Sequence, residues 1–364
     1  MQSPEHLVSE PAEPQPTHPK KSTLVGLGAL VGGFVVIAAL LAFSLGPDQR
    51  AKPETPEQTQ PGVPNTLPFQ EGSLWIDTTD AEAVSDAFLA EFSKSVPAID
   101  WEGSHARCDG GTSSAELRAS TLERVNFYRA MAGVPANVVE NEEFSEMAHS
   151  GAVMMSVEGE LSHEPPPSFS CYTQDGFESA SNSNLYLGRT GPSAIDGYVE
   201  DPGEDNADVG HRNTLLHPPT KEMGVANIES HQGYDDANLL WVFDDEVFET
   251  ETGARERDGY VAWPPRGFVP REIVYDRWSF SIAGADFSEA IVTVTTGGEE
   301  VPLSPLTTEG RPGRVPNPIV VWELDLQGSS EPAVYDVEIS DVSLGGETRD
   351  YRYSVSVLAP LLDQ

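Results

Sequence analysis

The middle of the chain repeats apolar residues at the period of an α-helix. A first helix is predicted to begin after the capping sequence Thr112-Ser-Ser and to end at Gly133. A second follows, a third begins at Pro192, and a fourth carries Val209 to Leu216. The inward positions of the first two helices are Leu122, Val125, Asn126 and Arg129, and then Phe144, Met147, Ala148, Gly151, Ala152 and Met155.

Strand-like alternation replaces this pattern further along the chain. Strands are predicted over residues 223–228 and 238–243. After Glu251 apolar residues alternate within five segments, which contain Trp278, Val292, Val320, Tyr335 and Tyr351. With Gly-Gly and Pro-Gly breaks between them, they predict a small antiparallel β-sandwich of immunoglobulin-like type over residues 251–364. Residues 260–270, rich in aromatic residues and proline, are interpreted as an extended strap packed against a domain.

The N-terminal part of the chain contains an uncharged apolar run. Leu24–Leu45, about 22 residues long, can cross a hydrocarbon core of about 30 Å as a helix. Lys20 and Lys21 precede it, which places the N-terminus in the cytoplasm and the main part of the chain outside the cell. A cleaved signal peptide is the alternative, but the run is longer than its apolar core. The prediction is a single-pass signal anchor over residues 22–46 in the cell membrane.

The segments beside this anchor have compositions of their own. Residues 1–21 predict a disordered cytoplasmic tail, because large apolar side chains are few. Residues 47–70 form a proline-rich linker that lifts the rest of the chain off the membrane. Residues 71–114 are an N-terminal extension in which residues 80–92 can be helical. The helical domain is placed at residues 115–250.

The net charge excludes some classes of binding partner, and the cysteine content predicts a disulfide. The net charge is −38, from 59 acidic and 21 basic residues. Such an acidic chain repels nucleic acid and anionic lipid surfaces, so neither is an expected partner. The two cysteines, Cys108 and Cys171, are predicted to form a disulfide if the domain is exported, since disulfides persist in oxidising compartments. Two buried thiols are the alternative.

Several short motifs of residues 115–250 resemble the CAP superfamily of cysteine-rich secretory, antigen-five and pathogenesis-related proteins, in their bacterial form. The matching residues are Val125-Asn126, Arg129, Gly133, Asn141, Phe144, Ala148, Ala152, Met155, Gly159-Glu-Leu-Ser-His163, Asn184-Leu185, Gly188, Gly210-His211-Arg212, Leu215-Leu216 and Met223-Gly224-Val225. No single motif is specific to this superfamily, but the order and spacing of the motifs together are. The resemblance implies a three-layer α-β-α sandwich, and so an α+β fold class for the whole chain.

The resemblance also implies a central cleft in which two histidines, usually with two glutamates, hold a divalent cation. By position the histidines are His163 and His211. Ser183 stands where the first glutamate is implied, and Asp196 is the only carboxylate near the second. These four residues are the predicted cleft, and the two histidines are the candidate ligands of zinc or calcium.

Two imidazoles begin a metal site, but a durable one needs three or four ligands. The carboxylates that could complete it are Glu164, Glu178, Asp196 and Asp201. The alternative is a polar cleft in which the histidines bond to each other, to Ser183 and to water. No Gly-x-Ser-x-Gly elbow is present, and a serine–histidine dyad through Ser162 or Ser183 lacks an identified orienting acid. No catalytic residue is assigned.

Three functions follow from these observations. The leading hypothesis is a membrane-anchored, extracellular, non-catalytic CAP protein that binds a small-molecule or lipidic ligand, or a surface partner. The second is a metal-assisted hydrolase that uses His163 and His211. The third is an adhesin in which the β-sandwich binds a cell-wall ligand and the CAP domain is a scaffold.

Overall fold

The computed structural model describes residues 73–244, 256–308, 316–326 and 331–362. The predicted tail, signal anchor and linker, over residues 1–70, lie outside these ranges. Within the described part of the chain, no helix is both long and apolar enough to cross a membrane. The described residues combine helices with β-sheets, as the predicted α+β class requires.

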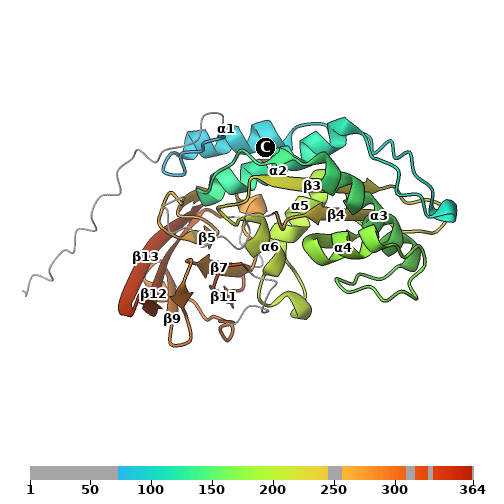
Figure 1. Ribbon diagram of the computed structural model, residues 1–364. Coiled ribbons are helices and arrows are strands. Elements are labelled where there is room, and N and C mark those ends of the chain that lie inside the picture. The colour runs from blue at the N-terminus through green and yellow to red at the C-terminus, as the bar shows by residue number, and fades with distance from the viewer. Residues whose placement is uncertain (1–72, 245–255, 309–315, 327–330, 363–364) are drawn as a thin grey trace, which may run out of the picture. The chain divides into compact units, whose positions relative to one another are not determined.

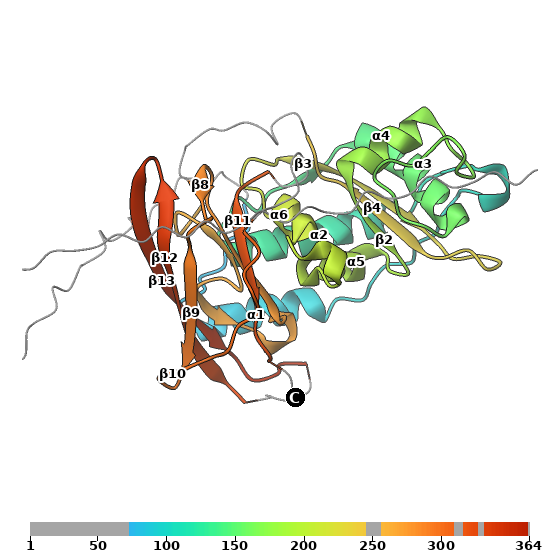
Figure 2. The same ribbon diagram turned by 90° about the horizontal axis from the view of Figure 1, so that it is seen from below.

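A four-stranded sheet lies between two layers of helices (Figures 1 and 2). The strand order is β1-β3-β4-β2, and only the β1–β3 pair is parallel. The strands are β1 (Val139–Glu140), β2 (Ser183–Leu187), β3 (Glu222–Ile228) and β4 (Ala237–Trp241). One layer contains α2 (Ala115–Ala132), α5 (Gly191–Glu200) and α6 (Gly210–Leu215). The other contains α3 (Glu142–Glu158) and α4 (Gln174–Asn182). We call these elements together the α-β-α region.

Neighbouring residues of the inner strands point to opposite helix layers, as the pleat of a strand requires. Val225 and Leu240 belong to the core that contains α2 and α5 residues. Ala226 and Leu239 belong to the core that contains α3 and α4 residues. The sheet is therefore buried on both faces, and all five residues of β4 are buried, including the polar Asn238. The two strands predicted here are confirmed.

Side chains and glycines set the ends of the main helices as the sequence predicts. Ser114 Oγ accepts from the N–H of Leu117 at the start of α2. Gly133 ends α2 with a φ of 74°, a left-handed conformation that favours glycine. Asn141 caps α3 through its side-chain oxygen. Asp80 caps α1 (Ala81–Phe92), which confirms the helix predicted in the N-terminal extension.

The predicted disulfide between Cys108 and Cys171 is present, so the alternative of two buried thiols is wrong. It joins residues 63 positions apart in sequence. Cys108 precedes α2 and Cys171 precedes α4, so the bridge ties the segment before the first long helix to the loop after α3.

Residues 256–362 are β-rich and form two sheets. A three-stranded sheet has the order β11-β7-β5, and a six-stranded sheet has the order β10-β9-β12-β13-β6, with β8 paired to β12. The strands are β5 (Val261–Trp263), β6 (Gly267–Val269), β7 (Arg277–Ser281), β8 (Ala285–Asp286), β9 (Ile291–Thr296), β10 (Glu299–Glu300), β11 (Ile319–Glu323), β12 (Ala333–Leu344) and β13 (Glu347–Val357). All five alternating segments predicted from the sequence are strands.

Two features of this β-rich region differ from the predictions. Residues 260–270 do not form an extended strap, because they provide β5 and β6 to the two sheets. The six-stranded sheet is not purely antiparallel, because β6 pairs with β13 in parallel. Short strands separated by prolines resemble an irregular connector in sequence, and only pairing with distant strands defines them.

The β-rich region shares one continuous hydrophobic core with the α2 side of the α-β-α region. The rings of Tyr128 on α2 and Trp263 on β5 lie 5.2 Å apart. The hydroxyl groups of Tyr128 and Tyr275 are 3.2 Å apart. At the N-terminal extension, the carbonyl of Thr78 accepts from the N–H of Phe268 at 2.7 Å. The two regions are thus packed as parts of one structure.

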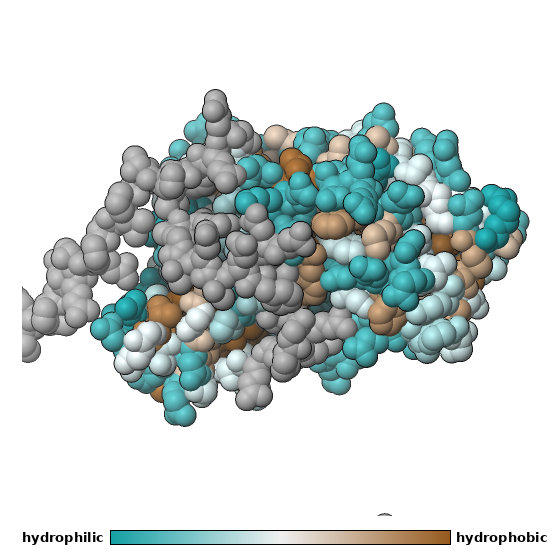
Figure 3. Space-filling model, in the orientation of Figure 1, coloured by the Kyte–Doolittle hydropathy of each residue, from teal (hydrophilic) through white to brown (hydrophobic). Residues whose placement is uncertain are grey.

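The described surface shows no large apolar patch on the face seen in Figure 3, where hydrophilic side chains predominate. Large apolar side chains that remain exposed come from separate parts of the chain: Leu74, Trp75, Leu89, Val96, Val139, Leu161, Ile291, Val334 and Leu362. Apolar side chains that are scattered in this way are normal for a protein surface.

Arg129 joins the end of α2 to the chain that follows α6. Its side chain is fully buried, and burial lowers its pKa to about 9, which leaves the guanidinium charged at pH 7. The guanidinium donates to the carbonyls of Pro135, Leu215, His217, Pro218 and Thr220. Leu215 is the last residue of α6, and the other four residues lie in turns or loops, so one side chain donates to carbonyls that lack helix or sheet partners. The carbonyl of His217 also accepts from the N–H of Thr220.

We expect Arg129→Met to lower the free energy of unfolding by at least about 3 kcal/mol, because buried carbonyls lose their donors. Chemical denaturation measures this loss. Arg107→Met is the matched control, since its side chain is 70% exposed and should change stability little. Equal losses in the two variants would contradict the role assigned to Arg129.

Candidate functional site

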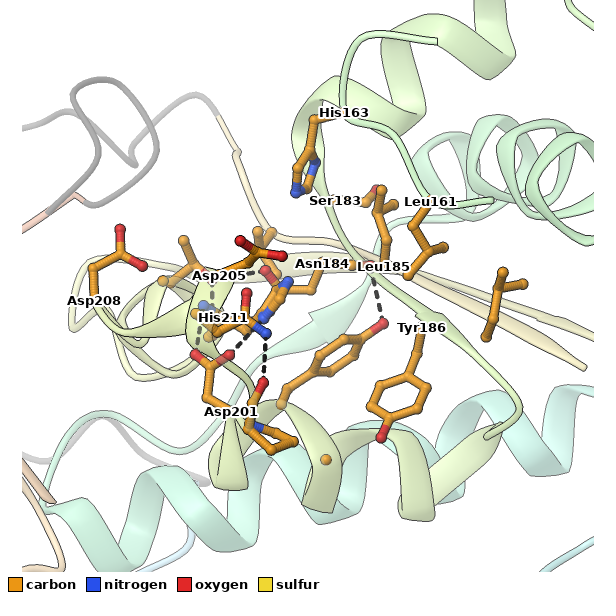
Figure 4. A pocket seen from close by; sticks show the side chains of 18 of the residues that line it. Leu161, His163, Ser183, Asn184, Leu185, Tyr186, Asp201, Asp205, Asp208 and His211 are labelled. Carbon is orange, nitrogen blue, oxygen red and sulfur yellow. Dashed lines mark hydrogen bonds and ion pairs between the residues drawn. The ribbon is translucent and has the colours of Figure 1, made fainter. Parts of the chain in front are cut away.

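A cavity of about 460 Å³ lies at the open edge of β2, the outermost strand of the central sheet (Figure 4). All five residues of β2 line it. The other walls come from residues 161–163, from α5, from α6 and the loop that connects the two helices, and from residues 242–243. Leucine, tyrosine and phenylalanine side chains form part of the lining, and histidine, aspartate, serine, threonine and asparagine side chains supply its polar part. The cavity thus combines apolar and polar surfaces.

Asp201 and His211 form the best-ordered polar pair in this lining. Asp201 is fully buried and ends α5 in a left-handed conformation. Its Oδ1 accepts from Nδ1 of His211 at 2.8 Å. Because an ionised carboxylate only accepts, Nδ1 carries the ring proton and Nε2 is the acceptor nitrogen of the neutral ring. The carboxylate thus fixes both the orientation and the tautomer of His211.

The second carboxylate oxygen of Asp201 serves the helix on which His211 lies. Oδ2 accepts from the backbone N–H groups of His211 and Arg212, at 3.1 and 3.3 Å. These are first-turn amides of α6, whose own N-cap residue, Val209, makes no side-chain bond. Asp201 therefore caps α6 from outside the helix.

His163 approaches the β2 edge from the side opposite to His211 (Figure 4). Its Nδ1 lies 2.9 Å from the carbonyl of Ala180 on α4. A carbonyl only accepts, so Nδ1 carries the proton in His163 too. The two imidazole centroids are 6.5 Å apart. The pair predicted from the sequence is therefore brought together, with Nε2 as the acceptor nitrogen in both neutral rings.

Ser183, the third predicted cleft residue, also lines the cavity. Its side chain is buried, and its Oγ has no hydrogen-bond partner among the described residues. A buried hydroxyl without a partner costs about 1–3 kcal/mol. Ser183 occupies the position where the resemblance implies a glutamate, so the cavity offers a hydroxyl there in place of a carboxylate.

Tyr198 connects the cavity wall to the central sheet. Its hydroxyl donates to Oδ1 of Asn238 at 2.8 Å and lies 3.0 Å from the carbonyl of Asn184. Burial raises the pKa of Tyr198 well above its ordinary value, so the hydroxyl stays protonated. Its ring lies 5.4 Å from that of His211. Tyr198 thus supports His211 from the α5 side.

The prediction that Asp196 lines the cleft is wrong. Asp196 is not among the residues that surround the cavity, and its two carboxylate oxygens each lie 2.7 Å from Nη1 of Arg124. The hydroxyl of Tyr128 also donates to it at 2.8 Å. Burial raises the pKa of Asp196, and Arg124 opposes this shift. A carboxylate with these partners serves the packing of α5 on α2.

The other candidate metal ligands are not assembled either. Glu164 and Glu178 are exposed and do not line the cavity. Asp201 does line it, but its carboxylate bonds the Nδ1 side of His211. Among the described residues, no three histidine, cysteine or carboxylate side chains are placed to hold a metal ion. The donor set of this cavity therefore fits a divalent cation poorly.

Comparison with known families agrees with this architecture. Residues 122–244, about a third of the chain, match the family model described as the cysteine-rich secretory protein family, CAP. This segment is a CAP domain. Comparison with curated proteins found no match. The matched segment contains His163, His211, Ser183 and Asp201, so the whole polar part of the cavity lies within the CAP domain.

Sequence reasoning gave Asp201 only as one of four carboxylates that could complete a metal site. Its role as the partner of His211 depends on the left-handed turn that ends α5, where Asp201 precedes Pro202-Gly203. An acidic residue before Pro-Gly, ten positions ahead of a histidine, was the available signal. Tyr198 is not among the predicted cleft residues, although it lines the cavity and its hydroxyl donates to Asn238.

His149, outside the cavity, is a buried structural histidine of α3. Its Nδ1 bonds the carbonyl of Ser145, and its Nε2 accepts from the N–H of Ser113 at 2.9 Å. Both nitrogens are thus used by the neutral ring. Burial, together with the charge of Arg118, lowers the pKa of His149 to about 4, although the hydrogen bond to Ser145 and the charge of Glu140 oppose this shift. Protonation of His149 would break the bond that joins α3 to the start of α2.

This shift predicts an acid-sensitive part of the stability. The folded pKa lies below the ordinary value of 6.5, so the stabilisation is present above pH 6.5 and is lost as the pH falls towards 4. We expect about 2 kcal/mol of the free energy of unfolding to depend on His149 between pH 7 and pH 5. Denaturation of the wild type and of His149→Gln at both pH values measures it.

The variant should lose less stability than the wild type over this pH range. His231→Gln, at an exposed histidine, is the control and should keep the wild-type dependence. Identical pH dependence in all three proteins would show that His149 titrates normally.

Proposed function

We propose that this protein is a ligand-binding protein whose CAP domain takes up a small amphipathic ligand in the cavity between His163 and His211. The observation that carries the proposal is the buried Ser183 hydroxyl, which has no partner among the described residues and lies in a cavity with partly apolar walls. Burial of a hydroxyl without a partner destabilises the folded protein, and a hydrogen bond to a bound ligand recovers this free energy. A volume of about 460 Å³ is in the range of small-molecule sites.

The lining suggests how a ligand would be oriented. Its apolar part would lie against the leucine and tyrosine side chains of β2 and α5. Its polar group would meet Ser183 Oγ and Nε2 of His211, which accepts a hydrogen bond from a neutral donor. Since Asp201 holds Nδ1 of His211, the ring keeps this orientation before a ligand arrives.

Metal-assisted hydrolysis, the alternative from the sequence, receives less support. The Asp201–His211 pair would suit a general base, but the described residues provide no third metal ligand. Elemental analysis of untagged protein distinguishes the two functions, since the binding function requires no stoichiometric metal.

The test of ligand binding uses Ser183→Ala and ¹⁹F NMR of 4-(trifluoromethyl)benzyl alcohol, which combines a hydroxyl with an apolar ring. The full-length chain is placed in lipid nanodiscs, with empty nanodiscs as the blank. We expect the variant to bind the probe about tenfold more weakly, because one buried hydrogen bond is lost. Its free energy of unfolding should rise by about 1 kcal/mol, because an unsatisfied hydroxyl is removed.

Ser288→Ala is the control, since Ser288 is exposed in the β-rich region and should alter neither measurement. No probe binding by the wild type, or equal binding by Ser183→Ala, would argue against the cavity as the ligand site.

We also propose that the chain is anchored in the cell membrane of a bacterium through residues 24–45, with the CAP domain outside. The support is the uncharged length of this segment and the two lysines before it. Protease added to intact cells should cut between Pro53 and Pro64 and release the CAP domain, which immunoblotting detects. Full protection of the chain in intact cells, with cleavage after lysis, would overturn this topology.

For the β-rich region we propose an immunoglobulin-like sandwich that completes the CAP domain. The shared core around Tyr128 and Trp263 supports this view over that of a separate adhesin, because a free-standing module would not bury these rings against its neighbour.

A further inference from the structure

The hydrogen-bonding direction of β2 alternates along the strand. The N–H of Val242 donates to the carbonyl of Asn182 at 3.0 Å, and the N–H of Gly188 donates to the carbonyl of Asp236 at 2.7 Å. In the antiparallel β2–β4 register these are bonded pairs, so residues 182, 184, 186 and 188 direct their backbone groups to β4. Ser183, Leu185 and Leu187 therefore direct theirs away from the sheet.

These outward backbone groups lie where the cavity is. Ser183, Leu185 and Leu187 all line it, and Ser183 and Leu185 are buried. Within the described ranges, β2 pairs only with β4. The backbone N–H and carbonyl of Leu185 point away from β4, and no residue in these ranges bonds them. Buried backbone groups without partners are rare, because each costs free energy comparable to a lost hydrogen bond. The unpartnered Ser183 Oγ lies at the same edge.

We propose that the ligand of the cavity is an extended peptide segment that pairs with the free edge of β2. This inference rests on the proposed binding function and names the class of ligand. The peptide backbone supplies donors and acceptors every second residue, which matches the period of Ser183, Leu185 and Leu187. Opposite a five-residue strand, the bound segment spans roughly 16 Å.

The cavity favours a single peptide strand over the other occupants of a sheet edge. A lipid chain has no donors and acceptors at strand spacing, so the backbone groups of Leu185 would remain unsatisfied. A second copy of this chain would bring the edge of a folded sheet. The β2 edge instead lies between residues 161–163 and the loop at residues 201–208, inside a cavity of about 460 Å³. His211 also lines the cavity, and its Nε2 accepts from a side chain of the peptide.

The experiment selects peptides from a random heptapeptide phage library on the full-length chain in nanodiscs and measures the affinity of the synthetic peptides by fluorescence anisotropy. Leu187→Pro removes one outward N–H but no bond to β4, so the fold should persist. We expect it to weaken peptide binding about tenfold. Leu187→Ala is the matched control, because it shortens the same side chain and keeps the N–H. Circular dichroism checks that both variants are folded.

A scan of N-methylated peptides gives a second readout. Methylation at alternate positions should abolish binding, and methylation between them should not, since only every second N–H faces β2. Equal sensitivity at all positions, equal binding by the two Leu187 variants, or failure to select any peptide would overturn the inference. If the fluorinated alcohol still binds in those cases, the proposed binding function survives. If the fluorinated alcohol does not bind but the peptides bind with the alternating sensitivity to methylation, only the proposal of a small-molecule ligand is contradicted.

Discussion

The geometry of the cavity depends on the carboxylate of Asp201. Asp201 stands where α5 must stop and the chain must turn back towards α6, and its left-handed φ of 52° makes that turn. One carboxylate oxygen holds His211, and the other holds the first-turn amides of α6. The carboxylate therefore positions a side chain and caps α6, while the backbone of the same residue ends α5. A carboxylate is suited to the first two tasks because it offers two oxygens that only accept.

The β-rich region holds the same loop from the other side. Nη1 of Arg277 on β7 donates to the carbonyls of Asp201, Gly203 and Asn206, and Glu323 on β11 binds the rest of the guanidinium. The loop between α5 and α6 is thus fixed by a side chain from beyond the CAP match. A CAP domain in this chain has its cavity wall ordered partly by residues outside the family segment, which agrees with the continuous core between the regions.

Much of the fold could be predicted because its signals are local. The spacing of Leu122 and Val125 and the glycine at position 133 specify α2 without reference to the rest of the chain. The α4 helix and the β2 strand could not be predicted, because Gln174–Asn182 is polar on most sides and Ser183-Asn184 has low strand propensity. The antiparallel pairing of β2 with β4, a contact remote in sequence, decides that strand.

The site was predictable in its histidines and not in its carboxylates. His163 and His211 lie in short motifs that can be recognised from their order along the chain. The partner of a carboxylate, in contrast, depends on which basic groups the fold brings near it. Asp196 lies on the α5 turn that faces Arg124, so the ion pair removes it from the cavity. Asp201, only five residues later, faces α6 because the helix has ended there.

The motif Gly210-His211-Arg212 places a positive charge of this acidic chain in the interior, because the side chain of Arg212 is buried. His211 faces the cavity, while Arg212 is buried on the opposite side of α6 and donates to the carbonyls of Val199 and Glu200 and to Ser279 Oγ of β7. Burial lowers the pKa of Arg212 to about 10, so it stays charged. Arg129 likewise donates to backbone carbonyls, whereas Arg277 also pairs with Glu323. Because carbonyls carry no net charge, Arg129 and Arg212 stabilise turns without neutralising acidic side chains.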